Sequence, residues 1–176
     1  SATHAFGRID ILVNNAGTNV PQTLENIHDD DWDRLIELNL TSCMALSRYL
    51  APQMKERHWG RIIFMSSIMG LASFHGRGAY SATKSALLGL CRAAALELGS
   101  FGITVNCIAP GPIVTDLPKS VLTEEQFTAV ANRTALGRWG NPKELVGPAL
   151  LLASQAGDYM TGSVVLVDGG ILARTF

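Results

Sequence analysis

Four short apolar runs, each followed at once by polar, proline or glycine residues, constrain the fold of this 176-residue chain more than any other feature. The runs occupy residues 9–13, 61–65, 103–108 and 163–167. They are largely continuous rather than alternating, which is typical of strands buried on both faces of a parallel sheet. The polar residues after each run mark the carboxyl ends of the strands, where parallel sheets bind their ligands.

Helical patterns separate the four runs. Apolar residues recur at the helical period in residues 31–57 and again in residues 80–98. Two more helix starts are indicated by a capping box that begins at Thr123 and by Asn141 followed by Pro142. Strands that alternate with helices predict a single α/β domain, in which helices cover both faces of a parallel sheet.

Composition excludes several classes of function. The chain has 14 Lys and Arg against 15 Asp and Glu, so a net charge of −1 does not favour nucleic acid or an anionic membrane as a partner. No apolar run approaches the ~20 residues of a membrane helix. Three widely spaced cysteines without a C-x-x-C motif predict reduced thiols in a cytoplasmic protein and no metal site.

Ser67, Tyr80 and Lys84 form a candidate catalytic group. Tyr80 and Lys84 are four residues apart at the start of a predicted helix and therefore share one face, and Ser67 follows the second strand. A nearby ammonium favours the phenolate and lowers the tyrosine pKa, so that the phenol exchanges a proton with an alcohol or ketone oxygen. None of these side chains supplies a hydride, so a nicotinamide cofactor is implied. The alternative is an ordinary surface pair of Tyr80 and Lys84.

Asn39 falls on the core-facing stripe, seven residues after Trp32. A buried amide must find hydrogen-bond partners or lose about 1–3 kcal/mol. Two interpretations are open at this point: Asn39 bends its helix for structural reasons, or it connects Lys84 to solvent through water.

Taken together, these motifs resemble those of the short-chain dehydrogenase/reductase family over essentially the whole chain. The matching segments are the N-N-A-G of residues 14–17, the tetrad Asn39, Ser67, Tyr80 and Lys84, the P-G-x-I-x-T of residues 110–115, and residues 161–170. The resemblance implies a Rossmann-like, doubly wound parallel sheet and an oxidoreductase that uses NAD or NADP.

The resemblance also implies roles for the tetrad. Tyr80 is the expected general acid and base, and Ser67 polarises the substrate oxygen. Lys84 lowers the Tyr80 pKa and binds the cofactor ribose, and Asn39 anchors a proton relay. The residues expected to line the cofactor are Asn15, Ala16, Gly17, Tyr80, Lys84, Pro110, Gly111, Ile113 and Thr115.

One family feature has no counterpart in this sequence. The family begins with a T-G-x-x-x-G-x-G loop that holds the pyrophosphate at a helix N-terminus, and the only glycines before residue 60 are Gly7 and Gly17. We therefore expect residues 1–176 to be the C-terminal portion of one domain, an incomplete Rossmann-like sheet without the first β-α-β-α-β. The choice between NAD and NADP and half of the dinucleotide site would be lost with it.

The expected substrate class comes only from sequence resemblance. Residues 137–147 and 157–162 are similar to gluconate 5-dehydrogenase and related sugar-acid reductases, whereas 3-oxoacyl-carrier-protein reductases share the same frame. His75 and Arg77 are the nearest cations for a substrate carboxylate, with Ser67 and Tyr80 at the reacting oxygen; solvated loop charges are the alternative. Residues 112–135 are expected to form a lid of two short helices.

Assembly is a separate expectation. We expect a homodimer or homotetramer, paired through the helices at residues 31–57 and 80–98, because their apolar stripes are wider than one sheet face needs. A non-catalytic, dimerising fragment of a dehydrogenase is the alternative in which the frame is kept without the activity.

Overall fold

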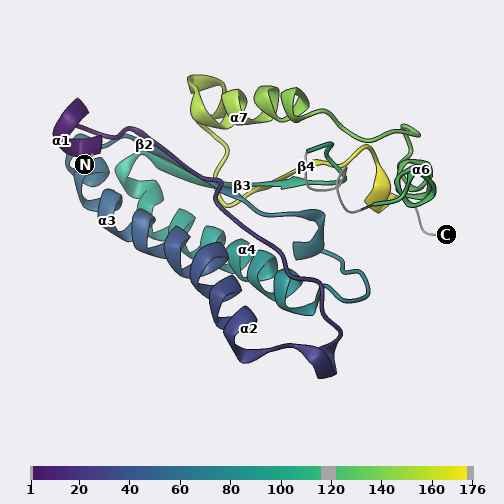
Figure 1. Ribbon diagram of the computed structural model, residues 1–176. Helices are drawn as coiled ribbons and strands as arrows, with labels where there is room; N and C mark the ends of the chain where they lie inside the picture. Colours follow the sequence, from purple (N-terminus) through teal and green to yellow (C-terminus); the bar gives the residue numbers. More distant parts are fainter. Residues whose placement is uncertain (1, 116–121, 174–176) are drawn as a thin grey trace.

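The computed structural model describes residues 2–115 and 122–173 of the chain. One sheet of four strands lies at its centre, in the order β1-β2-β3-β4 (Figure 1). The strands are β1 (Ile11–Asn14), β2 (Gly60–Met65), β3 (Ile103–Pro110) and β4 (Val164–Val167). Each predicted apolar run has therefore formed a strand, and the predicted parallel α/β sheet is confirmed.

All neighbouring strands are parallel, so their carboxyl ends meet at one edge of the sheet. Asn14 is opposite Phe64 in the first pair, and Pro110 is opposite Val167 in the last. The polar segments that follow the strands are gathered at this edge, where the sequence predicts a ligand site.

Helices cover both faces of the sheet. The elements of one face are α2 (Asp29–Ile36), the π-helical turn η2 (Glu37–Thr41), α3 (Ser42–Arg57) and α4 (Gly78–Leu98). Helix α7 (Val146–Ala153) lies on the opposite face (Figure 1). Strand β2 shows the division: Ile62 and Phe64 pack in the core beneath α3 and α4, whereas Ile63 packs with Leu152 of α7.

The helix predicted over residues 31–57 is wrong in one respect. It starts at Asp29 and is interrupted by η2, in which Asn39 lies. A π-helical turn inserts one residue into the helical repeat and is frequent at functional sites. The apolar stripe continues on both sides of the turn, so hydrophobic periodicity does not reveal it.

Short elements complete the described chain: α1 (Ala2–Phe6), α6 (Glu124–Arg133), and the 3₁₀ turns η1 (Leu24–Asn26), η3 (Ile68–Gly70), η4 (Gly99–Phe101), η5 (Pro142–Leu145), η6 (Gln155–Gly157) and η7 (Ile171–Ala173). The predicted capping boxes are present at Thr123 and Asn141. Of the two helices expected in residues 112–135, the structure describes α6, and residues 116–121 lie outside the described residues. No described helix is both long and apolar enough to cross a membrane.

Candidate active site

Ser67, Tyr80 and Lys84 are brought together where β2 ends and α4 begins. Ser67 is the second residue after β2, and Tyr80 and Lys84 occupy the first turns of α4. The η3 turn connects the two elements and packs against α4. The close packing of this connection places a hydroxyl, a phenol and an ammonium at the carboxyl edge of the sheet.

Ser67 is buried, and its oxygen already accepts one hydrogen bond. Its Oγ caps η3 by accepting a hydrogen bond of 3.1 Å from the Met69 amide. A hydroxyl has one donor hydrogen and two lone pairs, so the donor hydrogen of Ser67 remains available for another oxygen. The Ser67 hydroxyl lies close enough to Tyr80 to lower the pKa of its phenol.

The net shift of the Tyr80 pKa differs from the prediction. Burial raises the pKa of Tyr80 above its usual value, and the Ser67 hydrogen bond and the charge of Arg77 oppose this rise only in part. The expected lowering by Lys84 is therefore wrong for this structure. The neutral phenol is favoured near neutral pH, and a neutral phenol is a proton donor.

Lys84 lies under the Tyr80 ring, with Nζ 5.6 Å from the ring centroid. Its Nζ donates a hydrogen bond of 2.7 Å to the Met65 carbonyl, and burial lowers its pKa. An ammonium has three donor hydrogens, and Met65 is the one acceptor that the described residues supply. Lys84 therefore retains donors for another ligand.

Asn39 is fully buried and clamps the segment that follows β1. Its Oδ1 accepts from the Thr18 amide at 2.8 Å, and its Nδ2 donates to the Thr18 carbonyl at 2.9 Å. Nδ2 also donates to Thr83 Oγ1 at 3.1 Å, and this hydroxyl donates to the Tyr80 carbonyl at 2.8 Å. These contacts favour the structural interpretation of Asn39 and connect it directly to the first turn of α4.

The first predicted cofactor wall is the segment Asn15, Ala16 and Gly17, all three of which are exposed beyond β1. Gly17 makes a close approach: a Cβ atom there would lie 3.3 Å from Asn39 Oδ1 and 3.4 Å from Lys84 Nζ. The absent side chain thus leaves room for a ligand hydroxyl beside the free donors of Lys84. This arrangement fits the ribose of a nicotinamide cofactor.

The second predicted wall follows β3. The Gly111 amide donates to the Val167 carbonyl at 3.0 Å, and a Cβ atom on Gly111 would lie 2.6 Å from the Asp168 Cα. Ile113 is partly buried and bridges to Gly140, whereas Thr115 is exposed. Pro110 ends the strand, so the segment from Pro110 to Thr115 is held against the end of β4.

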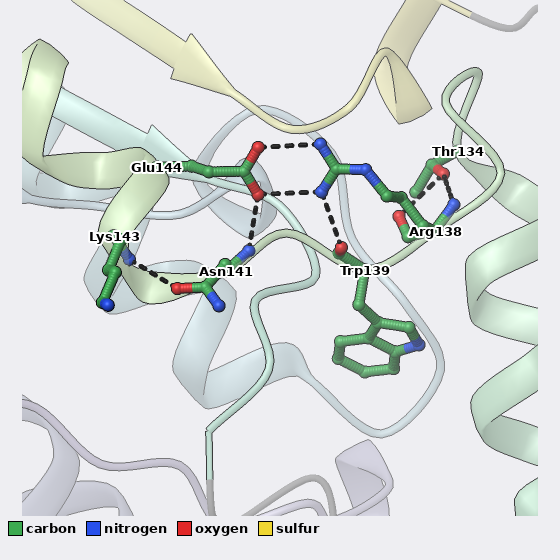
Figure 2. A network of polar contacts seen from close by, with 6 residues as sticks. All are labelled: Thr134, Arg138, Trp139, Asn141, Lys143 and Glu144. Carbon is green, nitrogen blue, oxygen red and sulfur yellow. Dashed lines mark hydrogen bonds and ion pairs between the residues drawn. The ribbon is translucent and has the colours of Figure 1, made fainter.

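A network around the predicted cap of Asn141 supports this second wall, and its ion pair between Arg138 and Glu144 was not predicted (Figure 2). The Arg138 guanidinium donates two hydrogen bonds, of 2.8 and 2.7 Å, to the Glu144 carboxylate. Glu144 also accepts from the Asn141 amide at 2.7 Å, and the Gly140 amide between them donates to the Pro112 carbonyl at 2.9 Å. Arg138 is therefore already paired with Glu144, and the segment from Arg138 to Glu144 holds the backbone next to Ile113 in place.

The two predicted substrate cations differ in their surroundings. His75 is exposed and its electrostatic partner is Glu25; the described residues show no contact from His75 to Ser67, Tyr80 or Lys84. Arg77 is partly buried at the start of α4, and its charge acts on Tyr80. No described residue forms an ion pair with the Arg77 guanidinium. Of the two predicted cations, Arg77 is therefore the one whose charge acts on Tyr80.

Comparison with known sequences places these features in context. The family model described as enoyl-(acyl carrier protein) reductase matches residues 1–172. A 2-dehydro-3-deoxy-D-gluconate 5-dehydrogenase of Pseudoalteromonas atlantica is 41% identical over 170 residues, which are 96% of this chain and 67% of that protein. A 3-oxoacyl-[acyl-carrier-protein] reductase of Vibrio cholerae is 38% identical over 169 residues, 96% of this chain and 69% of that protein.

Solved structures of related proteins have the same fold. A gluconate 5-dehydrogenase from Burkholderia cenocepacia, in complex with NADP and tartrate, superposes with a TM-score of 0.95 at 34% identity. The match covers 98% of this chain and 68% of that chain. An NAD(P)-dependent gluconate 5-dehydrogenase from Beutenbergia cavernae with bound NADP gives a TM-score of 0.94 at 36% identity, over 98% of this chain and 70% of that one.

Proposed function

Since the chain belongs to the short-chain dehydrogenase/reductase family, we propose that it provides the catalytic group of an NAD(P)-dependent enzyme that interconverts an alcohol and a ketone, with a sugar acid as substrate. The observation that supports this proposal most is the junction of β2 and α4, at which Ser67, Tyr80 and Lys84 converge. The family uses NAD(P), and two of its solved members hold NADP.

Proton transfer falls to Tyr80. Burial favours its neutral form, so in the direction of reduction the phenol donates a proton to the carbonyl oxygen of the substrate. When the substrate is bound, the one donor hydrogen of the Ser67 hydroxyl is directed to the same oxygen, and the Ser67 oxygen continues to accept from the Met69 amide. The two donors orient the carbonyl and stabilise the negative charge that develops on it.

The cofactor, when bound, supplies or accepts the hydride. Lys84 would hold its ribose with the donors that Met65 leaves free, next to the exposed segment from Asn15 to Gly17. The backbone from Pro110 to Thr115 would form the opposite wall, fixed by the network of Arg138 and Glu144 (Figure 2). Asn39 keeps the first wall in place through Thr18.

A carboxylate on the substrate is favoured by Arg77. This cation is partly buried, close enough to Tyr80 to influence its pKa, and without an acidic partner among the described residues. Arginine binds a carboxylate through two parallel hydrogen bonds. The solved gluconate 5-dehydrogenase from Burkholderia cenocepacia is a complex with NADP and the dicarboxylate tartrate, which supports an acidic substrate. The alternative is a 3-oxoacyl thioester, as the name of the Vibrio relative suggests.

A direct rate comparison tests the substrate class. In the longest form of the protein that contains residues 1–176, we expect 5-ketogluconate and related keto-sugar acids to be reduced faster than acetoacetyl thioesters. Arg77→Ala should raise the KM of the acids more than it lowers kcat, since a remote carboxylate contact is mostly uniform binding. Arg34→Ala, which removes an exposed cation from α2, is the matched control. A tenfold preference for the thioester would contradict the proposal.

We also propose a homodimer or homotetramer formed through α3 and α4. Leu46 and Tyr49 of α3 and Leu96 of α4 are large apolar side chains that lie exposed on these two helices. Burying such a surface against a second copy removes apolar area from water. Sedimentation at micromolar concentration tests the assembly, and a monomer would contradict it.

A cytoplasmic location is proposed from the cysteines. Cys43, Cys91 and Cys107 are free and buried in the described chain, as expected where thiols stay reduced. Three free thiols in the unfolded protein, isolated without reductant, are the expected result; a disulfide would contradict it.

A further inference from the structure

Gly70 is the last residue of η3, and it packs against the backbone of α4. A Cβ atom built on Gly70 would lie 2.8 Å from the Lys84 carbonyl oxygen and 2.9 Å from Ser66 Oγ. Contacts this short do not occur between a real Cβ and backbone atoms. Only glycine therefore permits the observed distance between the turn and the helix.

Two serine hydroxyls close the same junction. Ser66 Oγ donates a hydrogen bond of 2.9 Å to the Lys84 carbonyl, and Ser85 Oγ donates one of 2.9 Å to the Gly70 carbonyl. The Gly70 amide in turn donates to the Ser67 carbonyl at 2.9 Å. One short turn thus connects Ser67 on one side with the helix that holds Tyr80 on the other.

We infer that Gly70 is a positioning residue, which sets the distance between Ser67 and Tyr80 by allowing η3 to touch the backbone of α4. This inference deepens the proposed function and rests on it. It predicts that separating η3 from α4 moves the Ser67 hydroxyl away from the phenol without altering either side chain.

The size of the movement follows from the geometry. An ordinary van der Waals contact begins at 3.4 Å, so a methyl group at 2.8 Å requires the turn and the helix to separate by about 0.6 Å. Misplacement by about 1 Å can reduce a catalysed rate about 10²-fold. We therefore expect Gly70→Ala to lower kcat by about tenfold, with KM changed by less than about twofold.

The matched control is a glycine of α4 that has free space around it. A Cβ atom on Gly89, in the middle of α4, would meet nothing within 4 Å. Gly89→Ala adds the same methyl group without a contact, so kcat should be unchanged and the helix slightly more stable. Ser66→Ala serves as a second probe, because it weakens the junction by losing one hydrogen bond and adds no atoms.

The decisive readout is the ionisation of Tyr80, measured without substrate or cofactor. Phenolate absorbance after a rapid pH jump, minus that of the same variant carrying Tyr80→Phe, isolates Tyr80 from Tyr49 and Tyr159. The pKa of Tyr80 should rise in Gly70→Ala and in Ser66→Ala, because the Ser67 hydroxyl, which lowers this pKa, moves away from the phenol. It should stay constant in Gly89→Ala.

An unchanged Tyr80 pKa in folded Gly70→Ala would overturn the inference. If that variant does not fold, an unchanged pKa in Ser66→Ala would overturn it instead. A raised pKa in a protein that reduces no ketone would leave the positioning role intact and contradict the proposed function, so the two failures are distinguishable.

Discussion

Replacing Asn39 by alanine should destabilise the folded chain more than most single polar substitutions. The side chain is fully buried, and it makes three hydrogen bonds: 2.8 and 2.9 Å to the Thr18 backbone and 3.1 Å to Thr83 Oγ1. A typical intramolecular hydrogen bond contributes about 1 kcal/mol net. Losing three of them gives an expected loss of about 3 kcal/mol, a large part of the ~5–15 kcal/mol that stabilises most domains.

The assay is equilibrium unfolding in urea, followed by circular dichroism. Asn26→Ala is the matched control, because Asn26 is exposed and its side-chain hydrogen bonds to Thr23 and Glu25 lie at the surface. We expect the control to lose less than about 0.5 kcal/mol, as is usual for surface positions. If Asn39→Ala loses less than about 1 kcal/mol, the clamp on Thr18 does not hold the site in the way described.

Two further predictions concern the wall beyond β3. Gly111→Ala should destabilise the protein strongly, because the new Cβ would lie 2.6 Å from the Asp168 Cα. Gly147→Ala is the control and should be tolerated, because its Cβ would meet nothing within 4 Å. Thermal unfolding compares the two variants, and equal melting temperatures would contradict the predicted contact at Gly111. The Arg138 guanidinium lowers the pKa of Glu144 to about 2, so its stabilising contribution is complete above its ordinary pKa of 4.5 and is lost as the pH falls through about 2. The melting temperature of Glu144→Gln should therefore approach that of the wild type in acid, and a constant difference from about pH 6 to about pH 2 would contradict this.

Much of the fold was predictable because it depends on local patterns. The four apolar runs became the four strands within two residues of the predicted ends, and the capping boxes at Thr123 and Asn141 are present. Parallel pairing then brings the strand ends to one edge whatever the details of packing. For the same reason, Ser67 and Tyr80 could be expected to lie near one another from their positions after β2 and in the first turn of α4.

The features that were missed depend on contacts between distant segments. Asn39 of the π-helical turn is bonded to the Thr18 backbone, and Gly70 approaches the Lys84 carbonyl. Neither contact leaves a periodic signal in the sequence. The Tyr80 pKa was predicted in the wrong direction because spacing shows that a cation is near, whereas burial, which dominates the shift, requires the packed structure.

The central claim is that Tyr80 donates the proton to the substrate oxygen, and one substitution tests it most directly. Tyr80→Phe removes a single oxygen atom, and ketone reduction should be measured in the longest form of the protein that contains residues 1–176, with Tyr159→Phe, a fully exposed tyrosine, as the control. We expect Tyr80→Phe to lose nearly all of the rate while cofactor affinity stays within a few-fold, and Tyr159→Phe to keep the wild-type rate. Retention of more than about a tenth of the rate in Tyr80→Phe would contradict the account, because general acid catalysis contributes about 10²–10⁴-fold.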